Sequence, residues 1–256
     1  MAKIKGRMLP VSPFRQLVAD LMHFSAKVPT VCMDRMMDLG KVQAARQRCP
    51  SRPCWTAIFC KAFGLAAQHI PDLRRVYMSF PWPHLYEHPH SIATVNIERE
   101  WQGELVVFHA QVRSPEAQSL AKLDSFVHYL KDEPVAAVKY YRRIMNMMRV
   151  PWPLRKFVWW CALNLQVRRR VHNFGTFGIS TTAAHGAGIM KLVPMLTATL
   201  HYSLFDASNS LQMRLSFDHR VLDGATAAKT LAMMDDILHH EILDELLDMG
   251  VTKLAA

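Results

Sequence analysis

The chain has 256 residues, half of them apolar, and it carries 31 Lys and Arg against 21 Asp and Glu. This length and composition suit one large globular domain or two small ones and exclude intrinsic disorder. With 10 Gly and 14 Pro the chain is neither collagen-like nor of low complexity. Its five Cys are too few for a disulfide framework, and we expect reduced thiols.

The excess positive charge lies in one segment. From residue 134 to residue 205 the chain has no Asp or Glu, and the basic residues outside this segment equal the acidic ones in number. Such a concentration is typical of a face that meets an anion such as a phosphate, an acidic carrier protein or a lipid headgroup, although a solvated face without a partner gives the same pattern. The ten basic residues of the segment are Lys139, Arg142, Arg143, Arg149, Arg155, Lys156, Arg168, Arg169, Arg170 and Lys191.

The start of the chain does not resemble a secretory signal. Its basic residues are followed by Pro10 and Pro13 rather than by an apolar run, so we expect a cytoplasmic location. The most apolar run, Phe157 to Leu165, is far shorter than the ~20 residues that span a bilayer. We therefore expect no membrane-spanning segment.

Helices and a strand are predicted for the first part of the chain. Apolar residues at helical spacing predict a helix that begins after Ser12 and ends at Pro29. A short strand over Thr30–Met33 follows. The same spacing predicts a second helix over Trp55–Ala67, closed by Pro71, and its apolar stripe most simply packs in the core.

The proline-rich stretch Phe80–His90 predicts a loop. Its three histidines do not suit a metal site, because a proline interrupts their spacing and no Cys or carboxylate lies at zinc-ligand distance in the sequence. Cys49 and Cys54 do not indicate such a site either. After the loop the sequence predicts two strands and the turn between them, at Ile92–Ile97, Leu105–Val112 and Gln102-Gly103.

Two helix-like stretches, separated by Pro151-Trp152-Pro153, are predicted between Pro134 and Arg170. Aromatic side chains are interleaved there with nine of the ten basic residues, as on a membrane-surface helix or a nucleic-acid-binding face. Aromatic residues near helical spacing are more often core or subunit contacts, and we expect no nucleic-acid partner. Contact of residues 134–170 with a membrane surface stays open as a hypothesis.

The last third of the chain has the clearest pattern. Apolar and polar residues alternate over Leu196–Leu204 and again over Leu211–Phe217, which predicts a hairpin with one buried face. A helix is predicted to begin near Asp223, with apolar residues at spacings of four, three and four. His219 therefore lies in the loop between the second strand and this helix.

His219, Asp223 and Gly224 form a His-x-x-x-Asp-Gly pattern. A histidine titrates near neutral pH and can act as a general base, while a nearby carboxylate holds the local geometry. Taken alone the pattern is weak evidence for catalysis. The alternative interpretation is a structural histidine whose hydrogen bonds are made in the core.

The sequence around this pattern resembles a known family. Ser216 to Ala228 is similar to the active-site segment of the dihydrolipoamide acyltransferases, the core subunits of 2-oxoacid dehydrogenase complexes. Gly175 to Ser180 resembles that family's Gly-Thr-Phe-Thr-Ile-Ser strand, and Pro194 lies where the family has a Pro before its penultimate strand. The resemblance covers roughly residues 10 to 245, and its other matches are Ser12-Pro-Phe-Arg15, Ala19, Met22, Val28-Pro29, Asp38, Lys61-Ala62 and Pro71.

This resemblance implies a fold and site roles. The fold would be that of chloramphenicol acetyltransferase, a two-layer α/β sandwich with a mixed sheet covered by helices, and trimers would place each active site between subunits. His219 would take the proton from the attacking acceptor, and Ser180 would hydrogen-bond the oxyanion. Asp223 would orient the site, and Gly224 would allow a tight loop. His219 and Ser180 would then come from different chains.

The chain also departs from the family. We expect one acyltransferase domain over residues 1–256, with no lipoyl or subunit-binding domain and with an enlarged helical element at about 134–170. After Ser180 the family has Asn-Leu-Gly, whereas this chain has Thr181 to Gly186, which leaves the acceptor open.

We therefore predict a free-standing acyltransferase that uses acyl-CoA as co-substrate and needs no bound cofactor or metal. The acceptor would be a thiol, a hydroxyl or an amine, and an acyl-carrier thioester is the other candidate donor. One alternative is a dihydrolipoamide acyltransferase core served by lipoyl domains on another chain. Another is a trimeric binding module without turnover.

Overall fold

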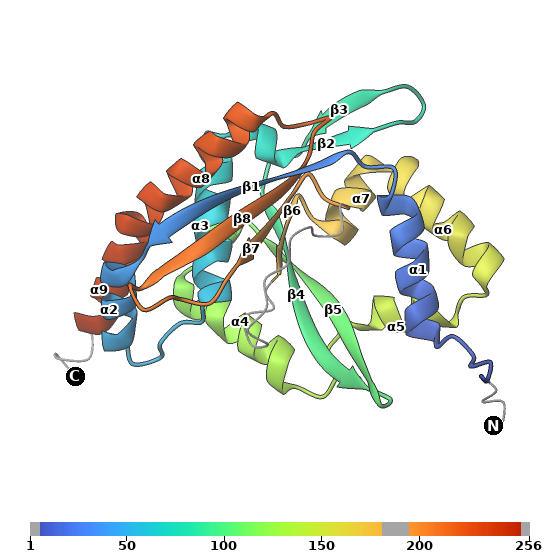
Figure 1. Ribbon diagram of the computed structural model, residues 1–256, viewed down its shortest axis with the longest axis horizontal. Coiled ribbons are helices and arrows are strands. Elements are labelled where there is room, and N and C mark those ends of the chain that lie inside the picture. The colour runs from blue at the N-terminus through green and yellow to red at the C-terminus, as the bar shows by residue number, and fades with distance from the viewer. Residues whose placement is uncertain (1–5, 181–194, 252–256) are drawn as a thin grey trace, which may run out of the picture.

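The computed structural model describes residues 6–180 and 195–251. A six-stranded mixed sheet crosses the molecule (Figure 1). Strand β6 is parallel to its neighbours β4 and β7, and the other neighbouring pairs are antiparallel. In spatial order the strands are β1 (Thr30–Asp38), β8 (Ser210–Asp218), β7 (Ala198–Tyr202), β6 (Phe177–Ser180), β4 (Ile92–Trp101) and β5 (Glu104–Arg113).

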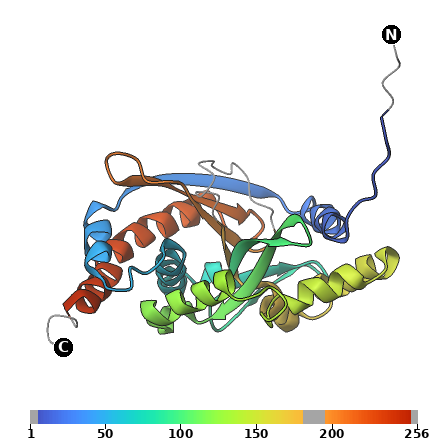
Figure 2. The ribbon, with the colours of Figure 1, turned by 90° about the horizontal axis from the view of Figure 1, so that it is seen from below.

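Helices cover one face of this sheet, as the family resemblance implies. Helix α3 lies against β4 and β6 in the middle of the sheet, α8 lies against β1 and β8 at one edge, and α4 lies against β4 (Figure 2). The bounds of these and the neighbouring helices are α1 (Pro13–Ser25), α2 (Gly40–Arg48), α3 (Trp55–His69), α4 (Leu120–Asp132), α8 (Gly224–His239) and α9 (Glu241–Val251), with short 3-10 turns at Pro71–Arg74 and Pro115–Ala117.

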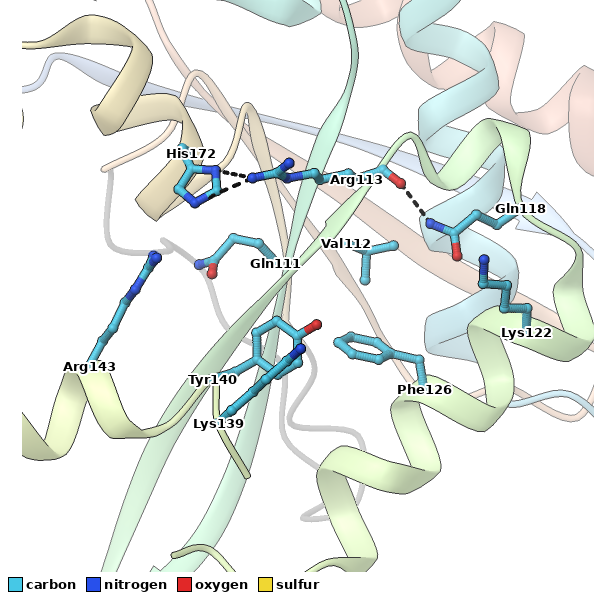
Figure 3. A pocket seen from close by; sticks show the side chains of 10 residues that line it. All are labelled: Gln111, Val112, Arg113, Gln118, Lys122, Phe126, Lys139, Tyr140, Arg143 and His172. Carbon is cyan, nitrogen blue, oxygen red and sulfur yellow. Dashed lines mark hydrogen bonds between the residues drawn. The ribbon is translucent and has the colours of Figure 1, made fainter. Parts of the chain in front are cut away.

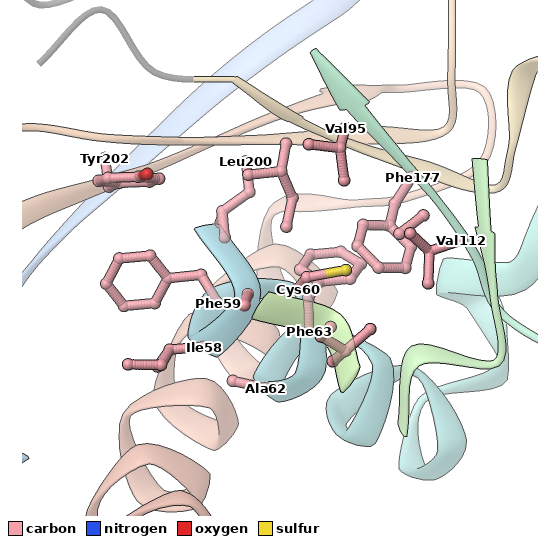
Figure 4. Packing of buried hydrophobic residues seen from close by; sticks show 14 of the residues in the cluster. Ile58, Phe59, Cys60, Ala62, Phe63, Val95, Val112, Phe177, Leu200 and Tyr202 are labelled. Atoms are coloured by element: carbon pink, nitrogen blue, oxygen red, sulfur yellow. The ribbon is translucent and has the colours of Figure 1, made fainter. Parts of the chain in front are cut away.

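Aromatic side chains fill the space between α3 and the sheet (Figure 4). Phe63 stacks on Phe177 with ring centroids 4.3 Å apart, and Phe59 lies 4.7 Å from Tyr202. All four rings are buried. Each of these residues removes a large apolar area from water, so this layer supplies much of the free energy that holds the sheet on α3.

The predicted hairpin and helix are present, but the hairpin does not have a single buried face, because all five residues of β7 are buried. In β8 the residues Leu211, Met213, Leu215 and Phe217 are all buried, as the alternation requires. The helix α8 begins directly after Asp223. Strand β1 is longer than the predicted Thr30–Met33, because it pairs with β8 over nine residues.

The prediction of a loop over Phe80–His90 was wrong in part. Residues His84–Glu87 form strand β3, which pairs with β2 (Arg75–Met78) in a separate two-stranded sheet. Pro83 and Pro89 lie just outside the paired residues. Prolines therefore break no ladder hydrogen bond there, which is why the stretch accommodates a strand.

The segment from Pro134 onward contains three helices rather than the two predicted stretches: α5 (Arg142–Arg149), α6 (Trp152–Asn164) and α7 (Val167–Phe174). Tyr141, just before α5, is buried with its ring stacked on Phe108 and its hydroxyl donating to the Leu130 carbonyl. Arg155 of α6 is buried in an ion pair with Asp20 of α1. The segment is thus packed into the fold, and Arg155 is not part of an anion-binding surface.

Candidate active site

His219 lies in the turn that follows β8. Its backbone N–H donates to the Pro29 carbonyl at 2.9 Å, where β1 begins. Its imidazole is exposed and lies 5.8 Å from the Phe217 ring, measured between ring centroids. The backbone is therefore held in place while the ring stays open to an approaching substrate.

The residues on either side of His219 brace this turn. Asp218 is buried, and Arg220 donates to both of its oxygens, with Nε at 2.9 Å from Oδ1 and Nη2 at 2.7 Å from Oδ2. The guanidinium of Arg220 also lies 4.2 Å from the centre of the Tyr77 ring. A two-pronged ion pair of this kind fixes geometry as well as adding energy. The sequence analysis missed this clamp, although opposite charges on both sides of a histidine were its signal.

Asp223 is the N-cap of α8. Its Oδ1 accepts from the Thr226 backbone N–H at 2.7 Å. Hydrogen bonds from Thr226, together with a smaller effect of His219, hold the pKa of the Asp223 carboxyl below its ordinary value. The carboxylate therefore sits at the positive end of the helix and within electrostatic reach of His219.

Gly224 does not have the role that was predicted for it. It is the first residue of α8, and positive φ is recorded among the described glycines only for Gly103 and Gly175. A Cβ at Gly224 would meet only the Met33 Cε, at an ordinary 3.8 Å. Within this chain the backbone does not require glycine at this position.

Ser180 is the last residue of β6, and it lies toward the opposite end of the strands from His219. It is level with His201 on β7, which in turn is level with Arg214 on β8. His219 comes five residues after Arg214, so it is roughly 16 Å further along the strand direction and two strands, about 10 Å, to the side. The structure therefore does not bring Ser180 and His219 together within one chain.

A polar row crosses the sheet at the level of Ser180. Beyond His201 and Arg214 it reaches Asp34 on β1, which accepts from Arg214 Nη2 at 2.6 Å. Burial, together with the charge of Arg214, lowers the pKa of His201. The residue opposite Ser180 is therefore an uncharged imidazole at neutral pH. Thr181 to Gly186, Lys191 and Pro194 lie outside the described residues.

Cys54 and Cys60 do not suit nucleophilic chemistry. Burial raises the pKa of Cys54 to about 11 and raises that of Cys60 further, so both thiols are protonated at neutral pH. Within residues 6–180 and 195–251, no three His, Cys, Asp or Glu side chains are grouped closely enough to hold a metal ion. In the same part of the chain no helix is long and apolar enough to cross a membrane.

No family model and no curated protein matches the chain, but solved structures are similar to it. The cubic core of a pyruvate dehydrogenase multienzyme complex matches with a TM-score of 0.66 at 19% identity, over 93% of this chain and 94% of that one. The dihydrolipoamide acetyltransferase of Azotobacter vinelandii matches with a TM-score of 0.65 at 18% identity, over 93% and 94%. A chloramphenicol acetyltransferase matches with a TM-score of 0.50 at 12% identity, over 86% and 94%.

The chain has the fold of these acyltransferases. This confirms the predicted architecture, a mixed sheet covered by helices as in chloramphenicol acetyltransferase.

Proposed function

We propose that the protein is an acyltransferase that moves an acyl group from a CoA thioester to a thiol, hydroxyl or amine acceptor. The observation that carries this proposal is the exposed imidazole of His219 on a braced turn of an acyltransferase fold. Acyl transfer from a thioester needs a base for the acceptor and a donor for the developing oxyanion. Residues of this chain can supply both groups.

In the proposed reaction the acceptor loses its proton to His219 as its heteroatom attacks the thioester carbonyl carbon. The carbonyl π electrons move to oxygen, and the Ser180 hydroxyl donates a hydrogen bond to that oxyanion. When the tetrahedral intermediate collapses, the carbon–sulfur bond breaks. The leaving CoA thiolate takes the proton from His219, which returns the imidazole to its starting state.

The two groups come from different chains in this proposal. The separation of Ser180 and His219 along the sheet rules out a shared substrate atom within one chain. A cyclic homotrimer with its sites between subunits would bring them together. In the Azotobacter vinelandii enzyme a serine, a histidine and an asparagine have been investigated for roles in catalysis, and its histidine and asparagine are four positions apart, as His219 and Asp223 are.

We also propose that α6 contacts an anionic membrane surface. Its outward side carries large apolar side chains with exposed fractions from 40% to 62%. Phe80 extends this surface, because its ring lies 5.9 Å from that of Trp160. The α6 patch consists of Phe80, Trp152, Leu154, Phe157 and Trp160.

The surroundings of the α6 patch favour a lipid surface as its partner. The Nζ of Lys156 lies 4.8 Å from the centre of the Trp152 ring, and Arg149, Arg168 and Arg169 are exposed nearby in the chain. Tryptophan, aliphatic side chains and cations with no acidic residue between them are the composition of interfacial helices. A cytoplasmic location with peripheral membrane contact is the corresponding proposal for where the protein works.

Sedimentation with vesicles tests the membrane proposal. We expect wild-type protein to sediment with mixed phosphatidylcholine and phosphatidylglycerol vesicles, and the double variant Phe157→Ser/Trp160→Ser to stay in the supernatant. The control Leu105→Ser/Leu247→Ser removes two exposed apolar side chains elsewhere and should sediment like wild type. If the wild type does not sediment, or if the patch variant sediments equally, the proposal is wrong. A change of oligomeric state in the patch variant would instead assign the patch to a contact between copies.

Release of free thiol from a panel of acyl-CoA thioesters, short to long, tests the enzymatic proposal. We expect release on some chain length that depends on His219, with a hydroxyl, amine or thiol acceptor present. Strong stimulation by dihydrolipoamide alone would favour the core of a dehydrogenase complex. Absence of release from every CoA and carrier-protein thioester would leave a binding module without turnover.

A further inference from the structure

A cleft lies at the opposite edge of the sheet from β1. It has a volume of about 610 Å³ and opens along β5, between α4 on one side and α5 and α7 on the other (Figure 3). Arg113 enters it from β5, Lys122 from α4, Lys139 from the segment before α5, Arg143 from α5 and His172 from α7. We call these five residues with their surroundings the β5 cleft.

The positive charge of the β5 cleft has no carboxylate to balance it. No Asp or Glu lines it, and no ion pair is recorded for Arg113, Lys122, Lys139 or Arg143 among the described residues. Elsewhere on the molecule exposed arginines do pair, as Arg35 does with Asp235. Four unpaired cations around one cavity repel one another until an anion occupies it.

Local contacts hold the cationic groups in place. Arg143 Nη1 donates to Asn173 Oδ1 at 2.7 Å, and the guanidinium of Arg113 lies against the ring of His172. Burial, together with Arg113 and Arg143, lowers the pKa of His172. These guanidinium groups are thus oriented before any ligand arrives, which reduces the entropy lost on binding.

Aromatic rings form the neutral wall of the cleft. Phe126 and Tyr140 meet edge to face with centroids 5.3 Å apart, and Lys139 Nζ lies 5.2 Å from the centre of the Tyr140 ring. A purely inorganic anion would leave these rings uncovered. Rings beside guanidinium groups suit an anion that carries a flat or apolar organic part.

We propose that the β5 cleft binds a phosphate ester, with its phosphate against Arg113 and Arg143 and its organic part against Tyr140 and Phe126, toward Lys122 on the opposite side of the cleft (Figure 3). Guanidinium groups match the paired oxygens of a phosphate in two-pronged contacts. The strand order places β5 four strands from β8, roughly 19 Å from the turn that carries His219. The strand β6, which carries Ser180, is two strands, roughly 10 Å, from β5. The proposal concerns ligand binding in the cleft rather than the catalytic groups, and it goes beyond the proposed function.

Calorimetric titration at low salt tests this site directly, with pyrophosphate, ADP and CoA as probes. We expect at least one probe to bind wild-type protein, and the double variant Lys122→Gln/Arg143→Gln to bind it at least ~10-fold more weakly, since charge-assisted contacts are lost. The control Lys41→Gln/Arg48→Gln removes two exposed charges on α2 and should bind like wild type. The four substituted side chains are all exposed. Equal melting temperatures of the wild-type protein and both variants would show that the variants are folded.

Two outcomes would overturn the proposal: no binding of any probe to wild-type protein, or equal weakening in the cleft and control variants. The KM for acyl-CoA of the same cleft variant, measured in the thiol-release assay, shows which phosphate ester the cleft binds. A raised KM for acyl-CoA would assign the cleft to the phosphates of the donor. An unchanged KM with lost binding would assign it to a separate phosphate ester. Because the titration needs no turnover, its result stands whether or not the proposed function is correct.

Discussion

Around His219, some residues hold the local structure in place, while His219 itself is free to take part in chemistry. Asp218 and Arg220 form the clamp, and Asp223 caps α8. His219 itself has an exposed ring. Its side chain can therefore be removed without opening a cavity in the core, which makes it a clean subject for substitution.

Substitution of His219 tests the base. In His219→Ala we expect turnover to fall by at least ~100-fold, the usual scale for loss of a general base, with the melting temperature close to that of wild type. The matched control is His240→Ala, which removes an exposed imidazole at the far end of α8. Equal activity of both variants would contradict the assignment of His219.

The Asp223 cap makes a prediction about pH. Because its folded pKa is lowered, the carboxylate stabilises the fold above its unfolded pKa of about 3.9, and this contribution is lost as pH falls through the lower folded value. Asp223→Asn should keep the cap without titrating, so its urea midpoint should fall less steeply on the acid side. Asp223→Ala removes the cap altogether, so it should lower the urea midpoint already at neutral pH. Identical acid profiles for wild type and Asp223→Asn would show that the carboxylate does not act in this way.

The helices and strands differ in how well local pattern predicts them. The β7–β8 hairpin follows from alternation, and α8 follows from spacings of four, three and four. The burial of both faces of β7 does not follow from its alternating pattern, because it depends on the packing of the rest of the chain. Strand β3 was missed because it is only four residues long and prolines lie on both sides of it, and such a cluster of prolines predicts a loop. Helix α2 gives little apolar signal, with only Val42 and Ala45 buried. Its packing against α9, rather than its own sequence pattern, accounts for its position.

The joint between α1 and α6 supplies the test at the element scale. Arg155 and Asp20 are both 1% exposed, so removing one partner leaves a buried charge. Arg155→Met should lower the free energy of unfolding by about 3–5 kcal/mol, whereas Asp20→Leu/Arg155→Met together should cost far less. The exposed pair of Arg35 and Asp235 is the control, and Arg35→Met should cost at most about 1 kcal/mol. Denaturant titration of the four proteins measures these differences, and an equal loss for both single variants would contradict the anchoring role of the buried pair.

The whole molecule decides what the site can do. The resemblance of short segments assigned His219, Ser180 and Asp223, but the distance between His219 and Ser180 depends on the register across β6, β7 and β8. No local pattern encodes that register, because it is set by pairing between strands far apart in the chain. The same holds for the β5 cleft: its basic residues are visible in the sequence, while their meeting at one edge of the sheet is not.

Mixing two inactive variants tests the central claim that each site joins groups from two subunits. His219→Ala and Ser180→Ala proteins are unfolded together in equal amounts, refolded, and assayed for acyl transfer beside each variant refolded alone. In a cyclic oligomer with random assembly, about a quarter of the sites regain both groups, so the mixture should recover about a quarter of wild-type activity. A mixture as inactive as its two parents, at the same oligomeric state as wild type, would contradict a site shared between subunits.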